Sequence, residues 1–207
     1  MGNKAILMSI KSPHSRNIFN MIKEYELRRY FNKKWADEQI KVFGGFMIYV
    51  YVTKEKPYLY IEFNEGGIEF FTENNVEGEE ILNGKIIGRL WCDRVDTFEF
   101  YETDENGNYT SVAYKSDNKE LGIFELEKKS CVDYDDILDY IGLNIGYAIH
   151  ISKLEVFDKP REINEFYTKK LYTNVDDMFT DEKQLEDGSW IRPLKKAPQS
   201  WQFIEGK

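Results

Sequence analysis

Strand-forming runs are distributed over nearly the whole chain, and this distribution is the strongest constraint on its fold. Apolar or aromatic runs of strand length are AILMSIK at 5–11, GFMIYVYVT at 45–53, GYAIHISKLEVF at 146–157 and WQFI at 201–204. Tyrosine and phenylalanine occur 14 times each, and aromatic side chains favour strands. Strands drawn from such distant parts of one chain predict an α+β fold, a closed or nearly closed β-barrel with a few short helices at its mouth.

Further strands are predicted between these runs. YLYIEF and IEFF are expected to form a hairpin joined at Gly66-Gly67, and the TDENGN segment favours the turn of another. The run at 84–101 is too long for one flat strand, so a bend or bulge is expected in it, at Gly88.

Only short helices are predicted. Ser12-Pro13 supplies an N-cap followed by proline at the first helical position, and apolar residues continue at helical spacing to about Ile22. Ser130 begins a capping-box-like S-x-x-D, which predicts a helix over VDYDDILDYIG. A third helix is expected near 175–185.

The chain has 207 residues and contains no linker rich in glycine, serine or proline. We therefore predict a single domain, 1–207. Its expected insertions lie near 57–83 and 102–130, and 158–207 forms an extended C-terminal segment.

Composition excludes several classes of protein. The two cysteines and two histidines have no metal or redox spacing, so neither a metal nor a cofactor is predicted. The start, MGNKAILMSIK, lacks the apolar run of a signal peptide, and no stretch has the length of a membrane span. We expect a cytoplasmic protein with no membrane partner.

Charge is distributed unevenly along the chain. The net charge of -9 divides into +6 for residues 1–60 and -15 for residues 61–207. Overall acidity repels bulk nucleic acid, because non-specific affinity comes from neutralising many phosphates. A local basic face could still bind a short strand or a single nucleotide, although scattered surface charge would give the same numbers.

The segment KEYELRR at 23–29 holds the central candidate residues. If Tyr25 and Leu27 point into a core, the period of a strand places Glu26 and Arg28 on the opposite face. That face either is solvated or lines a cleft. In a cleft, Lys23 and Arg28 could clamp a phosphate or a base edge, and Glu26 could accept from an exocyclic amine. On a solvated face, a Glu–Arg pair would contribute only about 0.2–1 kcal/mol.

The order of these elements resembles the ASCH branch of the PUA-like superfamily. Its members open with a strand like ILMSIK, followed by a helix and a G-x-K-x-x-E-x-R segment, which here supplies Lys23, Glu26 and Arg28. GKIIGRLWCDRV, YAIHISKLEVFDKP and APQSW are similar to segments of larger ASCH-like proteins common in phages and mobile elements. One departure is that the family glycine before the lysine is Met21.

The resemblance implies a PUA-like mixed-strand barrel with a cleft beside the first helix, lined by the K-x-x-E-x-R segment. Members are proposed to bind RNA, and related branches read modified bases or tRNA. A hydrolytic branch removes acyl groups from modified cytidine, using a lysine at the position of Lys23 with a threonine nucleophile. That threonine position is Glu26 in this chain, so this activity does not transfer directly.

A second group of residues would border the same cleft. Ser9 and Lys11 share one face of the first strand, and Gln199, Ser200 and Trp201 of APQSW offer hydrogen bonds and a stacking ring. Stacking of a base on an aromatic ring contributes about 1–3 kcal/mol. A core serine, a surface lysine and a core tryptophan are the competing interpretations.

Three functions remain open on these observations. The first is a module that binds short single-stranded RNA or a modified nucleotide. The second is a nucleotide- or RNA-processing hydrolase with Lys23 and Glu26 as its acid–base pair. The third is an acidic phage-type protein that binds a host protein. His150, a lone histidine, is given no role in a catalytic triad.

Overall fold

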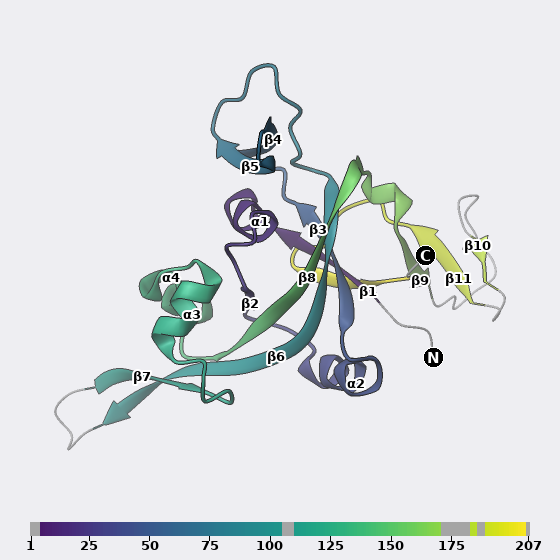
Figure 1. Cartoon of the computed structure of the whole chain (residues 1–207). Helices are drawn as coiled ribbons and strands as arrows, with labels where there is room; N and C mark the ends of the chain where they lie inside the picture. Colours follow the sequence, from purple (N-terminus) through teal and green to yellow (C-terminus); the bar gives the residue numbers. More distant parts are fainter. Residues whose placement is uncertain (1–4, 105–109, 171–182, 186–188, 206–207) are drawn as a thin grey trace. The chain divides into compact units, whose positions relative to one another are not determined.

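The computed structural model describes residues 5–104, 110–170, 183–185 and 189–205. Strands dominate it, and the α+β class is confirmed. The chain forms two compact units. Unit 1 comprises Met1–Phe19, Met47–Leu90 and Leu154–Lys207, and unit 2 comprises Asn20–Phe46 and Trp91–Lys153. The long strands β6 (Ile86–Asp104) and β8 (Ile145–Arg161) contribute residues to both units (Figure 1).

The first strand lies at the centre of unit 1. All six residues of β1 (Ala5–Ile10) are buried. The strand runs parallel to β3 (Phe46–Val52) and antiparallel to β12 (Trp201–Ile204). The strands predicted at 5–11 and 201–204 are thus confirmed, and the structure pairs them in one sheet. The buried core of this unit includes Ala5, Leu7, Tyr49, Tyr51, Ile86, Phe166, Leu194 and Ile204.

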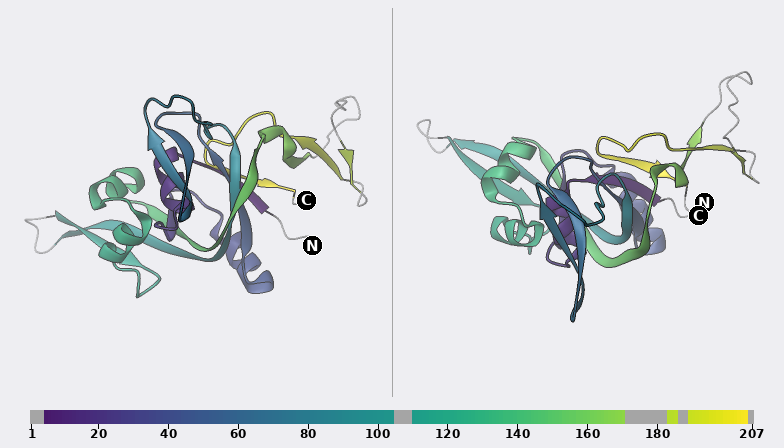
Figure 2. Two further views of the ribbon diagram at one scale, coloured as in Figure 1. Left: turned by 45° about the horizontal axis from the view of Figure 1, so that its top comes forward. Right: turned by 90° about the horizontal axis from the view of Figure 1, so that it is seen from above.

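A helix and a hairpin pack together within unit 1. The predicted hairpin is confirmed as β4 (Tyr58–Asn64) and β5 (Gly67–Glu73), which pair antiparallel. Helix α1 (Ser12–Phe19) lies beside it (Figure 2), and the Phe19 and Phe70 rings are 5.2 Å apart. The helix ends at Phe19, earlier than predicted.

The C-terminal part of unit 1 forms a small separate sheet. Its strands are β9 (Tyr167–Lys170), β10 (Lys183–Gln184) and β11 (Trp190–Pro193), in the order β10-β11-β9, after the 3-10 turn η1 (Ile163–Glu165). Most of the helix predicted near 175–185 lies outside the described residues, and Lys183 and Gln184 at its end are strand instead.

Unit 2 packs helices against strands. Strand β2 (Tyr25–Arg28) pairs antiparallel with β8, and β6 pairs with β7 (Thr110–Ser116). The helices are α2 (Lys33–Phe43), α3 (Ile123–Ser130) and α4 (Tyr134–Ile141). The core of the unit comprises Tyr25, Leu27, Phe98, Phe100, Leu121, Leu126, Ile137, Ile141 and Ala148.

The predicted barrel closure is not found. Hydrogen-bonded neighbours follow the order β12-β1-β3-β6-β8-β2, with β7 beside β6. Within the described part of the chain, the first and last strands of this order do not pair with each other, so the sheet is open. Long aromatic strands predict a sheet, but their sequence does not determine whether its edges meet.

Two local predictions concern Gly88 and Ser130. The run around Gly88 forms one strand, since β6 continues for 19 residues, and a bend or bulge within it stays a prediction. Gly88 permits close packing, because a Cβ there would lie 2.4 Å from the Glu155 carbonyl oxygen. Ser130 does not begin a helix. It is the last residue of α3, and Asp133 is the N-cap of α4.

Among the described residues, no helix has the length and apolar character needed to cross a membrane.

Candidate functional site

Lys23, Glu26 and Arg28 converge in unit 2, and we call these three side chains the charged cluster. The Lys23 Nζ lies 3.3 Å from Glu26 Oε2, and Arg28 Nη2 lies 3.0 Å from Glu26 Oε1. Their side chains are only 1%, 7% and 9% exposed for Lys23, Glu26 and Arg28 respectively. The alternative of a solvated strand face is therefore wrong for these residues.

Strand β2 is covered on both faces, which explains this burial. Tyr25 and Leu27 point into the core of unit 2, as predicted. The C-terminal end of α3 contacts the same segment, since the Glu24 backbone N–H donates to the Lys129 carbonyl at 2.8 Å. The Lys23 Nζ donates to the Ser130 carbonyl at 2.7 Å. The last carbonyls of a helix have no partner within the helix and attract cations, so the ammonium of Lys23 satisfies α3 as well as Glu26.

Two backbone turns beside the charged cluster adopt an unfavourable conformation. Met21 has φ 56° and Cys131 has φ 53°, both in the left-handed region that glycine prefers. The two turns are in contact, because Cys131 Sγ donates to the Ile22 carbonyl at 3.7 Å. Residues in this conformation cost about 1–3 kcal/mol each and often lie at functional sites. Met21 therefore adopts, without being glycine, a backbone conformation that glycine prefers.

The charged cluster carries a net positive charge. Two cations share one carboxylate, so the three side chains carry one net positive charge. Glu26 contacts both partners through different oxygen atoms and holds Lys23 and Arg28 at the same place. An arginine guanidinium fixed in this way presents a planar fork suited to a phosphate or a carbonyl.

The second predicted group lies in unit 1. The Ser9 hydroxyl donates to the Pro198 carbonyl at 2.6 Å, and the Ser9 backbone N–H donates to the Ser200 carbonyl at 2.8 Å. The first strand and the APQSW segment are therefore in contact. Lys11 and Gln199 are exposed.

The tryptophan of APQSW is half-buried. Trp201 packs edge-on against Phe203 with ring centroids 5.4 Å apart. Because this group and the charged cluster belong to different units, a common cleft that holds both stays a prediction.

Unit 2 also contains an aspartate–histidine pair that the sequence does not predict. His150 Nδ1 and Asp93 Oδ1 are 2.6 Å apart, and the His150 ring lies 5.2 Å from the Tyr25 ring. His150 pairs in register with Tyr25, so it belongs to the strand that supports β2. No sequence signal joins residues 93 and 150, which meet only when β6 and β8 fold.

Asp96 is the centre of a second polar cluster, which contacts β2 through Tyr25. This buried carboxylate accepts from the Tyr25 hydroxyl at 3.1 Å, Arg94 Nε at 3.0 Å and Asn118 Nδ2 at 3.1 Å. Burial raises the pKa of Tyr25 to about 12, and the nearby Asp96 charge acts in the same direction, while Arg94 opposes it. These contacts hold Tyr25 in place and so position β2, the strand that carries Glu26 and Arg28.

Tyr30 and Trp35 lie close in sequence among basic residues, but their side chains have different surroundings. Tyr30 is exposed and stacks with Arg29, whose guanidinium lies 5.5 Å from the ring centroid. Trp35 instead packs edge-on against Phe46, with ring centroids 4.8 Å apart. Lys33 pairs with Asp37 one turn along the helix.

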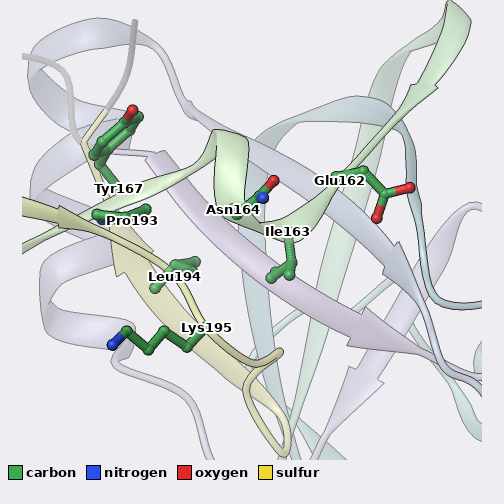
Figure 3. A pocket seen from close by; sticks show the side chains of 7 residues that line it. All are labelled: Glu162, Ile163, Asn164, Tyr167, Pro193, Leu194 and Lys195. Carbon is green, nitrogen blue, oxygen red and sulfur yellow. The ribbon is translucent and has the colours of Figure 1, made fainter. Parts of the chain in front are cut away.

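An open depression of about 630 Å³ lies in unit 1 (Figure 3). It is lined by Glu162, Ile163, Asn164, Tyr167, Pro193, Leu194 and Lys195. None of the predicted site residues lines it. Across the described ranges, no group of three histidine, cysteine, aspartate or glutamate residues is arranged to hold a metal ion.

Comparison with known proteins finds similar structures but no matching family model or curated sequence. No protein-family model matches the sequence, and no curated protein matches it significantly. The crystal structure of ASCH from Zymomonas mobilis is similar with a TM-score of 0.49 and 10% identity, over 99% of this chain and 90% of that chain. A mutant of the same protein gives a TM-score of 0.47 and 11% identity, over 98% of this chain and 89% of that chain. Both carry the name of the family that the sequence motifs resemble.

Proposed function

We propose that this chain is an ASCH-like, PUA-like module that binds a short single-stranded RNA or a modified nucleotide through the charged cluster. The observation that carries the proposal is the convergence of Lys23 and Arg28 on the one carboxylate of Glu26. A surface ion pair would not require the burial of three ionic groups, which costs several kcal/mol per ion unless partners compensate. The strained turns at Met21 and Cys131 add support, because such strain is concentrated at functional sites.

The proposed mode of recognition follows from the chemistry of each group. The Arg28 fork donates to a phosphate oxygen or a base carbonyl, while Glu26 fixes the guanidinium and accepts from an exocyclic amine. Lys23, anchored on the Ser130 carbonyl, contributes positive charge. With side-chain exposures of 9% or less, the cluster suits one nucleotide group rather than the continuous backbone of a duplex.

Binding of a fluorescein-labelled single-stranded RNA of eight nucleotides, followed by anisotropy, tests the proposal. Arg28→Lys keeps the charge but removes the bidentate fork, so affinity should fall about tenfold. The adjacent exposed residue provides the matched control, and Arg29→Lys should change affinity less than about twofold. Equal effects of the two substitutions, or an absence of salt-sensitive binding, would contradict the proposal.

The hydrolase alternative depends on the same pair of residues. The 3.3 Å contact between Lys23 and Glu26 is the observation that favours it. Incubation of the full chain with acylated nucleosides and short RNAs should then give turnover that Lys23→Met abolishes. Turnover that survives this substitution would exclude the pair as catalytic residues.

A further inference from the structure

The β4–β5 hairpin has an apolar face that extends beyond its covered part. Leu59 and Phe70 on this face are buried, and Phe70 packs on Phe19 of α1. Further along the same face, Phe63 and Ile68 stand directly opposite each other in the strand register. Phe63 is 82% exposed and Ile68 is 53% exposed. A cross-strand phenylalanine–isoleucine pair is a typical packing pair, and here its outer surface faces solvent.

The opposite face of the same hairpin is acidic. Glu62 and Glu69 stand directly opposite each other, and like charges in this arrangement destabilise a hairpin. Residues 57–84 contain seven glutamates and no lysine or arginine. Burial raises the pKa of Tyr60, and the carboxylates of Glu73, Glu62 and Glu79 raise it further, so these negative charges lie close together.

We propose that the hairpin tip, residues 62–69, docks onto a basic protein surface that has an apolar pocket. Phe63 and Ile68 would enter the pocket, and Glu62 and Glu69 would pair with lysine or arginine side chains around it. Charge complementarity specifies the partner. Glu80 pairs with Lys85, but the tip itself carries Glu62, Glu65 and Glu69 and no lysine or arginine, so it attracts a basic protein and repels nucleic acid. The like-charge pair is explained in the same way, since a cation from the partner relieves a repulsion that the free hairpin tolerates. The hairpin tip belongs to unit 1 and shares no residue with the proposed RNA site, which uses residues of unit 2.

A synthetic peptide that alternates arginine with leucine serves as the probe for this surface. Its binding to the full chain is measured by fluorescence anisotropy at two salt concentrations. Two further peptides, one with serine in place of leucine and one with glutamate in place of arginine, separate the apolar and the charged contributions. The arginine–leucine peptide should bind most tightly and should weaken as salt increases.

Matched substitutions test whether the peptide binds at the hairpin tip. Phe63→Ser should weaken binding of the arginine–leucine peptide about tenfold. Phe124 on α3 is equally exposed at 82%, and Phe124→Ser should leave peptide binding unchanged. The double substitution Glu62→Gln and Glu69→Gln should reduce the salt dependence. Asp135→Asn with Asp136→Asn alters the net charge equally and should not.

A charge reversal distinguishes a binding role from a structural one. Glu69→Lys places opposite charges across the hairpin, so thermal stability should rise while peptide binding falls. The proposal is overturned if the arginine–leucine peptide does not bind, or if Phe63→Ser and Phe124→Ser act alike. It is also overturned if Phe63→Ser abolishes binding of the eight-nucleotide RNA, which would assign the hairpin to the nucleic acid. Unchanged RNA binding in the hairpin variants keeps this test independent of the proposed function.

Discussion

At the scale of single residues, the chain accepts local strain in order to build the charged cluster. Met21 takes a left-handed backbone conformation although its side chain is 80% exposed and gains little from burial. The side chain of Lys23, two residues later, is almost completely enclosed by Glu26 and the Ser130 carbonyl. The left-handed turn therefore directs the chain into β2 at a cost in free energy that the packing of β2 must offset.

Substitution of Met21 by glycine should stabilise the protein. The left-handed conformation costs a residue with a Cβ about 1–2 kcal/mol, and glycine recovers part of that cost despite its greater freedom in the unfolded chain. We expect Met21→Gly to raise the free energy of unfolding by about 0.5–1 kcal/mol in urea titrations. Met21→Ala retains the Cβ and should give no gain. Equal stabilities of the glycine and alanine variants would contradict the assigned backbone conformation.

Tyr25 links stability to alkaline pH. Its pKa is raised to about 12, chiefly by burial, while an unfolded tyrosine ionises near pH 10. Between these values the unfolded state has lost its proton and the folded state has kept it, so stability falls as pH rises from about 10 to 12. Tyr25→Phe should make this decline shallower in urea titrations across that range. Burial also raises the pKa of Tyr114 to about 12, so Tyr114→Phe should act in the same direction. A decline unaffected by either substitution would show that other groups control it.

At the scale of secondary-structure elements, helix α3 covers the polar face of β2 and so buries the charged cluster. The sequence correctly predicts that Tyr25 and Leu27 point inward, because alternation along a strand is a local property. It does not predict which element covers the other face. Ser130 resembles a helix start in sequence, yet α3 ends there, and the glycine-like turn at Cys131 is formed without glycine.

Helix α2 was missed for a different reason. Its caps are visible in the sequence, since the Asn32 side chain accepts from the Trp35 backbone N–H and Gly44 ends the helix with φ 75°. Between these caps the helix is rich in charged residues, and only Ala36 is buried. Attention to the caps rather than to hydrophobic spacing would have identified this helix.

The charged cluster should be far more sensitive to the loss of its carboxylate than a surface ion pair. Glu26→Gln leaves two buried cations together, and the breaking of a buried ionic group typically costs about 3–5 kcal/mol. Glu24→Gln is the matched control, since Glu24 forms an exposed pair with Lys129 at 3.5 Å. That control should cost less than about 1 kcal/mol. Free energies of unfolding from urea titrations distinguish the two variants. Similar costs would contradict the buried arrangement.

At the scale of the whole molecule, the two proposed binding surfaces, the charged cluster and the hairpin tip, have opposite charge. The chain has a net charge of -9, and residues 57–84 contribute seven of its acidic groups without a cation. Such a molecule attracts nucleic acid only where cations are concentrated, as they are in the charged cluster. The sequence reveals this charge asymmetry and the strand-rich class. It does not reveal the open sheet or the two units, because these depend on long-range pairing.

Salt dependence of RNA binding should therefore be weak. Each phosphate neutralised on a single strand lowers the slope of log affinity against log salt concentration by about 0.7, so one net positive charge predicts a slope of about -0.7. Lengthening the RNA from six to twenty nucleotides should add little affinity beyond the statistical gain. A slope steeper than about -3 would indicate a broader basic surface.

The most direct test of the central claim observes the guanidinium of Arg28 itself. In ¹⁵N-labelled protein, the Nε–Hε resonance of each arginine can be followed by NMR as a six-nucleotide RNA is added. We predict that the Arg28 resonance shifts first and most strongly, while that of the neighbouring Arg29 changes little. A shift at Arg29 with an unmoved Arg28 resonance would contradict the assignment of the charged cluster as the nucleotide site.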